Sequence, residues 1–155
     1  MLKPYMPQQE IAVMDAIFAL KRPKRVLEYG AGGSTVRWSR LPYVERWDAV
    51  EHDPDWYAVV AGATLKANIV KGSADDPEGY VTPPGLRPPY DLIFVDGIFR
   101  VECVRNAPEY LTEHGVLVLH DASRTHYREC WDALPNLVHL TRGDGLRDGL
   151  MVMWR

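Results

Sequence analysis

The amino-acid sequence predicts an α/β protein, a three-layer sandwich in which one mixed sheet lies between two layers of helices. Two features predict this class. Between residues 24 and 119, short apolar runs alternate with segments of helical periodicity, which is typical of parallel strands joined by crossover helices. The last two apolar runs, 137–141 and 149–154, are separated only by RGDGLRD, so they predict an antiparallel hairpin with no crossover helix.

Length and composition indicate a single domain. The chain has 155 residues, of which 46% are hydrophobic and 25% are charged, and a chain of this length can bury its own core without disulfides or metals. We expect one domain over residues 1–155, with an N-terminal helical segment over 1–23 and the sheet with its crossovers over 24–155. Cys103 and Cys130 form no CxxC motif, so they predict two reduced thiols, neither a disulfide nor a zinc site.

Charge and hydropathy argue against two kinds of partner. The formal net charge is -3, and lysine and arginine form no continuous stripe, which argues against nucleic-acid binding. The opening MLKPYMPQQE has no long apolar stretch, and no later run approaches the roughly 20 apolar residues that a membrane span needs. We therefore expect a cytoplasmic protein that binds neither nucleic acid nor a membrane.

The chain is predicted to begin with a helix, a strand, a tight turn and a second helix. Apolar residues at helical spacing predict an amphipathic helix over residues 8–20. These residues are Ile11, Met14, Ile17 and Phe18. Residues 24–29 form a short apolar strand that leads into glycines, and 34–41 read as a brief helix that ends before Pro42.

The same alternation continues through the middle of the chain. Residues 46–51 predict a second strand, after which Asp53 and Pro54 are typical of the cap and first position of a helix. Residues 68–71 predict a third, short strand. Residues 72–89 contain five of the 12 prolines and little periodicity, so they predict a long irregular surface loop.

The second half predicts two more strands and two helices before the hairpin. Residues 90–95 are almost all apolar, as in a central strand that is buried on both faces. A helix is expected over 100–113, kinked or split by Pro108, followed by a fifth strand over 115–119 and a helix over 127–134. The residues expected to face inward from the first of these helices are Val101, Val104 and Leu111.

The polar clusters of this chain fall at the predicted carboxyl ends of the strands, where open α/β sheets bind their ligands. In VLEYGAGGST, the glycines at 30, 32 and 33 would let the backbone turn tightly, with the amides of residues 33–35 pointing into the crevice. A dinucleotide fingerprint, G-x-G-x-x-G, would need a glycine where Thr35 stands. A nicotinamide oxidoreductase is therefore a disfavoured alternative.

A carboxylate at the next strand end predicts adenosine binding. Glu51 stands nineteen residues past Gly32 and could accept hydrogen bonds from both hydroxyls of a ribose, although a strand-end charge exposed to solvent is the simpler alternative. His52 or Trp56 could cover a face of the base, and Trp56 could equally belong to the core.

The segment GSADD follows the third predicted strand. Ser73, the amide of Ala74 and Asp75 could meet the adenine edge, with Asp75 accepting from the exocyclic amine, or these residues could form an ordinary loop.

The order VLEYGAGGST, VEHD, GSADD, YDLIFVDG, GVLVLHD and a terminal hairpin resembles the class I S-adenosylmethionine-dependent methyltransferases over residues 25–154. LEYGAGGSTV and VDGxFRVxC are also similar to a bacterial group of methyltransferase-like proteins. The resemblance implies a Rossmann-like seven-stranded sheet whose last strand is antiparallel, with S-adenosylmethionine across the ends of strands one to four. Glu28 and the glycines would then face its methionine part, Glu51 its ribose and Asp75 its adenine. The cofactor-binding residues expected are Glu28, Gly30, Gly32, Gly33, Ser34, Thr35, Glu51, His52, Ser73, Ala74 and Asp75.

Asp96 and Asp121 follow the fourth and fifth predicted strands and are expected to face the same crevice as candidate catalytic residues. The pair resembles the metal-binding acids of catechol-type O-methyltransferases, but Ala122 stands where that family has an asparagine. We therefore expect no metal site, with a divalent cation as the alternative. Asp96 could seat the cofactor's ammonium group or the substrate, and Asp121 or His120 could act as the base. Asp121 could instead cap a helix.

Three further features border the expected site. His126 could be a catalyst or a surface residue, Arg100 could meet an acidic group of the substrate or be solvated, and residues 4–9 could line the entrance. The sequence predicts a methyltransferase that acts on an oxygen of a small molecule, because carboxylates dominate the expected site. The alternative is a noncatalytic binding or regulatory module, since the chain is short and the acid set incomplete. A homodimer could form through the hairpin or the region of Trp131.

Overall fold

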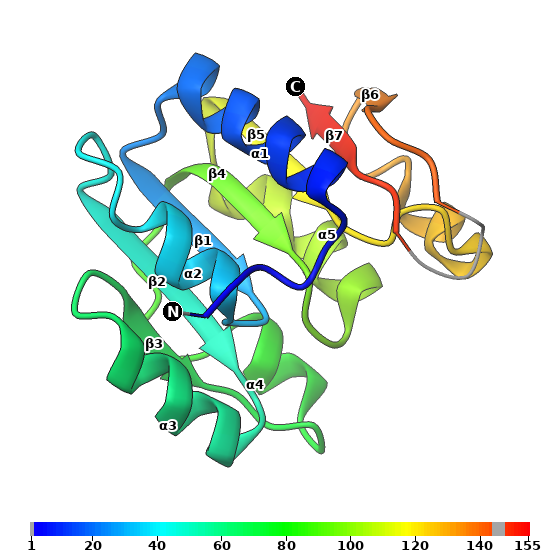
Figure 1. Ribbon diagram of the computed structural model, residues 1–155. Coiled ribbons are helices and arrows are strands. Elements are labelled where there is room, and N and C mark those ends of the chain that lie inside the picture. Colours follow the sequence, from blue (N-terminus) through cyan, green and yellow to red (C-terminus); the bar gives the residue numbers. More distant parts are fainter. Residues whose placement is uncertain (1, 144–147) are drawn as a thin grey trace.

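The computed structural model describes residues 2–143 and 148–155. Seven strands form one sheet in the order β3-β2-β1-β4-β5-β7-β6 (Figure 1). Neighbouring strands from β3 to β5 are parallel, whereas β7 is antiparallel to both β5 and β6. The strands are β1 (Arg25–Tyr29), β2 (Arg46–Glu51), β3 (Asn68–Lys71), β4 (Tyr90–Val95), β5 (Leu111–Leu119), β6 (Asn136–His139) and β7 (Met151–Trp154). The predicted mixed sheet with its antiparallel hairpin is confirmed; residues 144–147 of the expected hairpin turn lie outside the described residues.

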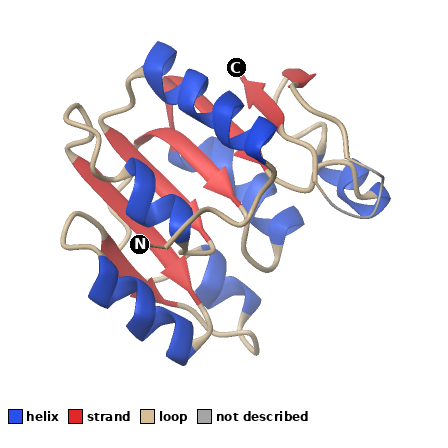
Figure 2. Cartoon of the chain, viewed as in Figure 1, coloured by secondary structure: helices blue, strands red, loops and turns tan. Residues whose placement is uncertain are grey.

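Helices cover both faces of the sheet, which completes the three layers (Figure 2). They are α1 (Gln8–Lys21), α2 (Gly33–Trp38), α3 (Pro54–Ala63), α4 (Pro77–Val81), α5 (Arg100–Tyr110) and a 3-10 helix, η1 (Thr125–Cys130). The first three pack on one face and the last three on the other. None of the helices in the described part of the chain is long and apolar enough to cross a membrane.

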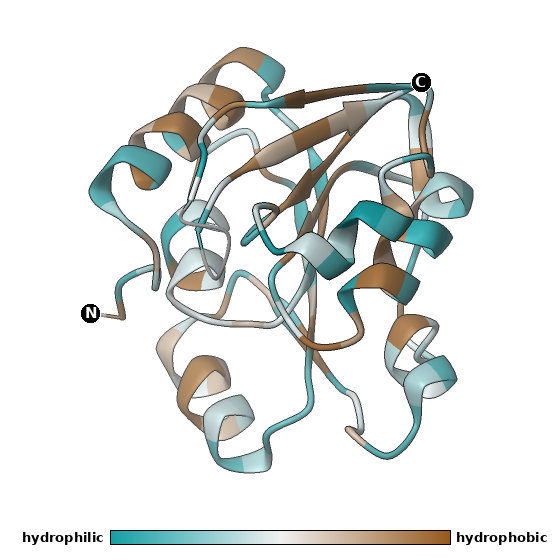
Figure 3. Cartoon of the chain, turned by 90° about the vertical axis from the view of Figure 1, so that its right-hand side faces the viewer, coloured by the Kyte–Doolittle hydropathy of each residue, from teal (hydrophilic) through white to brown (hydrophobic). Residues whose placement is uncertain are grey.

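The core consists of two apolar layers divided by the sheet. Along β4, Leu92 and Phe94 face α1 to α3, while Ile93 and Val95 face α4, α5 and η1. All four side chains are fully buried, so the prediction of a central strand buried on both faces is confirmed. Figure 3 shows hydrophobic residues concentrated along the strands.

Three segments differ from the sequence prediction. The loop over 72–89 contains α4, which begins where Asp76 accepts a hydrogen bond from the Gly79 amide at 2.9 Å. The helix expected over 100–113 ends at Tyr110, and Leu111 already pairs with Tyr90 as the first residue of β5. Three residues before that strand, Pro108 has no amide hydrogen to continue the helical ladder.

The segment expected as a helix over 127–134 is the 3-10 helix η1. Its amides bond three residues back, as from Tyr127 to Arg124 at 3.1 Å and from Trp131 to Arg128 at 3.2 Å. This tighter winding suits a short connection whose Tyr127 and Cys130 side chains must both reach the core.

Candidate active site

The carboxyl ends of β1, β2 and β4 lie next to one another at one edge of the sheet. Tyr29 pairs with Val50 on one side and with Val95 on the other. After β1, the amides of Gly30 and Ala31 both donate to the carbonyl of Val50, at 2.8 and 3.3 Å. The glycine turn therefore begins between the end of β2, which carries Glu51, and the end of β4, which precedes Asp96.

Two glycines of this turn are required by close backbone contacts. Gly30 has φ +94°, and a Cβ there would lie 2.6 Å from the Cα of Gly97 in the loop after β4. A Cβ on Gly33 would collide with the carbonyl oxygen of Lys3. Lys3 belongs to residues 2–7, which we call the N-terminal strap; it crosses this edge of the sheet ahead of α1 (Figure 1). At Gly32, in contrast, a Cβ would touch only two side-chain tips, at 3.8 and 3.9 Å.

Glu28 is fully buried below the turn and braces it. Its Oε1 accepts a hydrogen bond from Ser34, and its Oε2 accepts from Thr35 and from the Trp47 indole. Burial raises the pKa of Glu28 to about 8, although these three donors oppose the shift. The Glu28 carboxyl group and the Ser34 and Thr35 hydroxyls thus face one another inside the protein, and their predicted contact with a cofactor stays a prediction.

Glu51 is held at the end of β2 by the two amides that follow it. The amides of His52 and Asp53 each donate to Oε1 at 2.9 Å, while no described residue donates to Oε2. His52 lies half-buried beside it, with Nδ1 3.1 Å from Oε1 but not aligned for a hydrogen bond. One carboxylate oxygen is thereby fixed, and the other has capacity to accept further hydrogen bonds.

Trp56 lies over the glycine turn. Its indole donates to the carbonyl of Ala31 at 2.7 Å, and its side chain is 40% exposed. The alternative that Trp56 belongs to the core is therefore wrong. Asp53 caps α3 below it, accepting from Asp55 and Trp56 amides, as the sequence predicts.

The segment after β3 runs beside Glu51, because the Gly72 amide donates to the Glu51 carbonyl at 2.8 Å. The three residues after Gly72 were predicted to contact the adenine, and all three are exposed: Ser73, Ala74 and Asp75. The Ser73 hydroxyl accepts the Asp75 amide at 3.1 Å, which holds this short segment in a turn.

Tyr80 of α4 packs beside the candidate site and was not part of the sequence prediction. Its fully buried ring stands edge-on to His52 and Phe99, with centroids 6.3 and 5.7 Å away, and its hydroxyl has no hydrogen-bond partner among the described residues. A Cβ on Gly97 would collide with that hydroxyl. The signal for it was DDPEGY, in which Asp76 and Pro77 start a helix that turns Tyr80 inward.

His120 links the end of β4 to the N-terminal helix. Its Nδ1 lies 2.7 Å from Oδ1 of Asp96, and its Nε2 lies 2.9 Å from Oε2 of Glu10. Burial alone would lower the pKa of His120, but Asp96, Asp121 and Glu10 outweigh it and raise that pKa above its usual value. Two neighbouring carboxylates stabilise the protonated form of a histidine, and the predicted role of His120 as a base stays a prediction.

Glu10 of α1 is the second residue that the sequence prediction missed. It is 2% exposed, and its Oε1 also accepts from the Thr141 hydroxyl and the Gly149 amide, at 2.8 and 2.6 Å. Glu10 precedes Met14 by one helical turn on the buried face of α1. A glutamate on the otherwise apolar face of the predicted helix was the signal in the sequence that could have identified Glu10.

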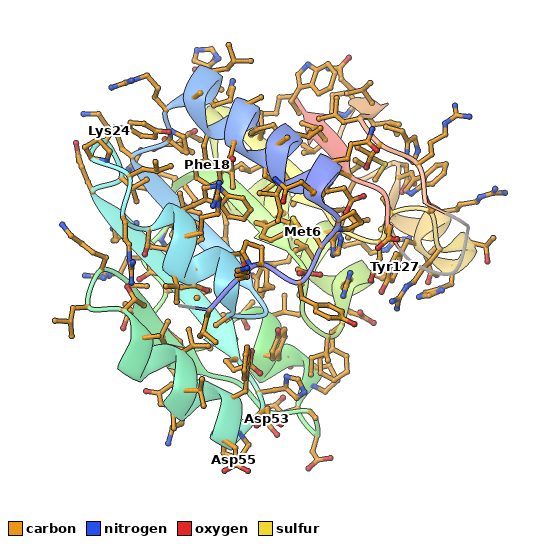
Figure 4. All side chains as sticks on the ribbon, in the orientation of Figure 1. Met6, Phe18, Lys24, Asp53, Asp55 and Tyr127 are labelled. Atoms are coloured by element: carbon orange, nitrogen blue, oxygen red, sulfur yellow. The ribbon has the colours of Figure 1, made fainter. Side chains whose placement is uncertain are left out.

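Asp121 is also engaged within the protein. Its Oδ1 accepts from the Asp148 amide at 2.6 Å, and its Oδ2 lies 3.1 Å from Arg100 and 2.7 Å from Arg124. Asp121 caps no helix with its side chain, and its φ is +54°. Asp96, with a 20% exposed side chain, is more open than Asp121 and His120. Figure 4 labels Asp53, which caps α3, Met6 of the strap and Tyr127 of η1.

Arg100 and His126, which were predicted to border the site, differ in their exposure to solvent. Arg100 is largely buried and pairs with Asp96 and Asp121, so it is neither solvated nor free to meet a substrate. His126 is exposed and lies against Tyr127, with ring centroids 4.1 Å apart.

No protein-family model matches this sequence, and no curated protein matches it significantly. Solved structures match over almost the whole chain. The O-methyltransferase from Bacillus cereus in complex with SAH has a TM-score of 0.71 at 16% identity, covering 98% of this chain and 84% of that one. The O-methyltransferase TomG from Streptomyces achromogenes in complex with SAM has a TM-score of 0.67 at 18% identity, with coverage of 97% and 82%. A methyltransferase-like protein from Silicibacter pomeroyi has a TM-score of 0.72 at 21% identity, with coverage of 99% and 90%. With the strand order and the glycine turn described above, these likenesses identify the fold of this chain as that of the class I S-adenosylmethionine-dependent methyltransferases.

Proposed function

We propose that this protein is an S-adenosylmethionine-dependent methyltransferase that methylates an oxygen atom of a small molecule. One observation carries the proposal: Glu51 and the glycine turn share one edge of the sheet, and Oε2 of Glu51 has no donor among the described residues. That oxygen is suited to accept hydrogen bonds from ribose hydroxyls. The structures with SAM or SAH that match this fold support the same cofactor.

The cofactor would extend along this edge from the end of β3 to the end of β4. Its adenine would meet the exposed turn of Ser73 to Asp75, with His52 beside the ring. Its methionine part would pass Gly32, where the backbone carries no side chain and the surroundings leave space. Asp96 would seat the ammonium group or the methyl acceptor.

In this reaction the protein mainly has to orient the cofactor and the methyl acceptor. The bound sulfonium supplies an activated methyl group, and transfer is an in-line displacement that needs the acceptor oxygen about 3 Å from the methyl carbon. Of the two acids that follow β4 and β5, Asp96 has the more exposed side chain, so it is the group proposed to take the acceptor's proton. His120 and Asp121 would position Asp96 and its loop without touching the acceptor.

Calorimetric titration with S-adenosylhomocysteine tests cofactor binding. Glu51→Gln keeps an oxygen for the His52 and Asp53 amides but replaces the free oxygen with an amide donor. Losing hydrogen bonds to a charged acceptor should weaken binding by about 10- to 100-fold. Glu45→Gln is the matched control, because Glu45 is exposed at the opposite end of β2 and pairs with Lys24. If the unmodified protein binds no S-adenosylhomocysteine, the proposal is wrong.

A noncatalytic binding module is the second candidate, favoured by the internal pairing of His120 and Asp121. Methyl-labelled S-adenosylmethionine, incubated with the protein and a fractionated metabolite extract, separates the two. Label in an acceptor fraction that is lost with Asp96→Asn supports the enzyme. Binding of S-adenosylhomocysteine without transfer to any fraction supports the module.

A further inference from the structure

The acid pair at the ends of β4 and β5 has the spacing of a cation site. Asp96 and Asp121 follow neighbouring parallel strands, and with His120 they bring ligand atoms within 4.8 Å of one another. Groups of carboxylate oxygens at such spacing can bind divalent cations. The resemblance to catechol-type O-methyltransferases points to a metal at this pair.

Arg100 already occupies the space between these carboxylates. Its Nη2 lies 3.2 Å from Oδ1 of Asp96, and its Nη1 lies 3.1 Å from Oδ2 of Asp121. Three carbonyl oxygens complete its surroundings, those of Asp96, Gly97 and His120, at 3.0, 2.8 and 2.9 Å. Five oxygens thus face the guanidinium, as many as it has N–H groups.

The fold holds this guanidinium in place. The Arg100 side chain is 11% exposed, and its guanidinium carbon lies 5.8 Å from the centre of the Tyr127 ring. The carbonyls of Asp96 and Gly97 belong to the loop that leads from β4 into α5, and Arg100 is the first residue of that helix, so this loop bends around the cation that follows it. Withdrawing Arg100 would remove one cationic partner from each of two carboxylates and a hydrogen-bond donor from each of three carbonyls.

The remaining donors that a metal would need are also engaged. Ala122, at the position of the family's asparagine, is fully buried and offers no side-chain oxygen. Both ring nitrogens of His120 lie on carboxylates, and Arg124 brings a second positive charge to 2.7 Å from Asp121. Glu10 and Asp148 add acids on the far side of His120, where Oε1 of Glu10 is occupied by Thr141 and Gly149. The residues present do not fit a divalent cation between Asp96 and Asp121.

We propose that Arg100 is the permanent cation of this acid pair, standing where a divalent metal would otherwise bind. A guanidinium that makes four hydrogen bonds and a further ion pair within the protein is not free to chelate an acceptor, so it acts as a positioning residue for Asp96. For the reaction, and here the inference rests on the proposed function, the acceptor presents a single ionisable hydroxyl to Asp96. An acceptor that needs to chelate a metal through two neighbouring hydroxyls would find no metal at this pair.

Manganese binding tests the inference without using the cofactor. Electron paramagnetic resonance of Mn²⁺ added to the purified protein should show no site tighter than about 1 mM, the weak end of protein cation sites. Arg100→Met keeps the length of the side chain and removes its charge, so a Mn²⁺ site should appear with at least tenfold tighter binding. Arg100→Lys keeps the charge and should show no such gain. Adding Asp96→Asn to Arg100→Met should abolish the new site.

Two results would overturn the inference. One is tight Mn²⁺ binding by the unmodified protein that Asp96→Asn removes. The other is an Arg100→Met protein with native circular dichroism and no gain in Mn²⁺ affinity. If Arg100→Met does not fold, the measurements on the unmodified protein and its Asp96→Asn variant still decide. Because no step uses S-adenosylmethionine, failure of the proposed function would leave this outcome unaffected.

Discussion

Glu28 should make the protein less stable as the pH rises from 5 to 8. Its pKa is raised from 4.5 to about 8 by burial, so in this range the folded chain retains a proton that the unfolded chain releases. Stability falls with rising pH wherever the folded state binds more protons than the unfolded state. At about 1.36 kcal/mol per pKa unit, the free energy of unfolding should fall by about 3 kcal/mol between pH 5 and pH 7 through this group.

Glu28→Gln isolates this effect because glutamine has the same shape and does not ionise. Urea unfolding at several pH values, followed by tryptophan fluorescence, gives the free energy of unfolding of both proteins. The difference between them should shift by about 3 kcal/mol in favour of the variant from pH 5 to pH 7, whatever its value at pH 5. Glu109→Gln, at an exposed position, should leave the pH dependence unchanged. Parallel curves for the unmodified protein and Glu28→Gln would refute the reasoning.

Three further predictions concern single contacts. Asp53→Ala removes the cap of α3 and should lower the free energy of unfolding by about 1 kcal/mol in urea titrations. Gly97→Ala should destabilise by about 1–3 kcal/mol because its methyl group meets the Tyr80 hydroxyl, and the loss should shrink in a Tyr80→Phe background; an equal loss in both would show that Tyr80 is not the obstacle. Glu10→Gln removes a carboxylate from the His120 ring, so the pKa of His120 in an NMR titration should fall.

The strands were the most predictable part of the fold. The predicted bounds of 46–51, 68–71 and 90–95 agree with β2, β3 and β4. Parallel strands buried on both faces appear in a sequence as short apolar runs between turn residues. The segments around α4 and η1 lack such a signal. Their conformation depends on Tyr80 and Tyr127 reaching a core made by other parts of the chain.

The site residues that lie at the carboxyl ends of strands could be predicted from the sequence. Glu51 is the last residue of β2 and Asp96 follows β4 directly, so the topology alone brings them to one edge. The partners of Glu10 could not be foreseen, because His120 and Gly149 stand 110 and 139 residues away along the chain. Likewise, the sequence does not reveal that the Arg100 side chain turns back to contact Asp96.

The contact between Gly30 and Gly97 limits how this scaffold can be redesigned. Two loops that touch main chain to main chain cannot gain bulk on either side, so a mutagenesis library aimed at new acceptors would lose most members with substitutions there to misfolding. Variation is better directed to surfaces that tolerate size, such as Tyr5 of the strap, which is 95% exposed. Substitutions in the strap would then leave the contact between the two loops unchanged.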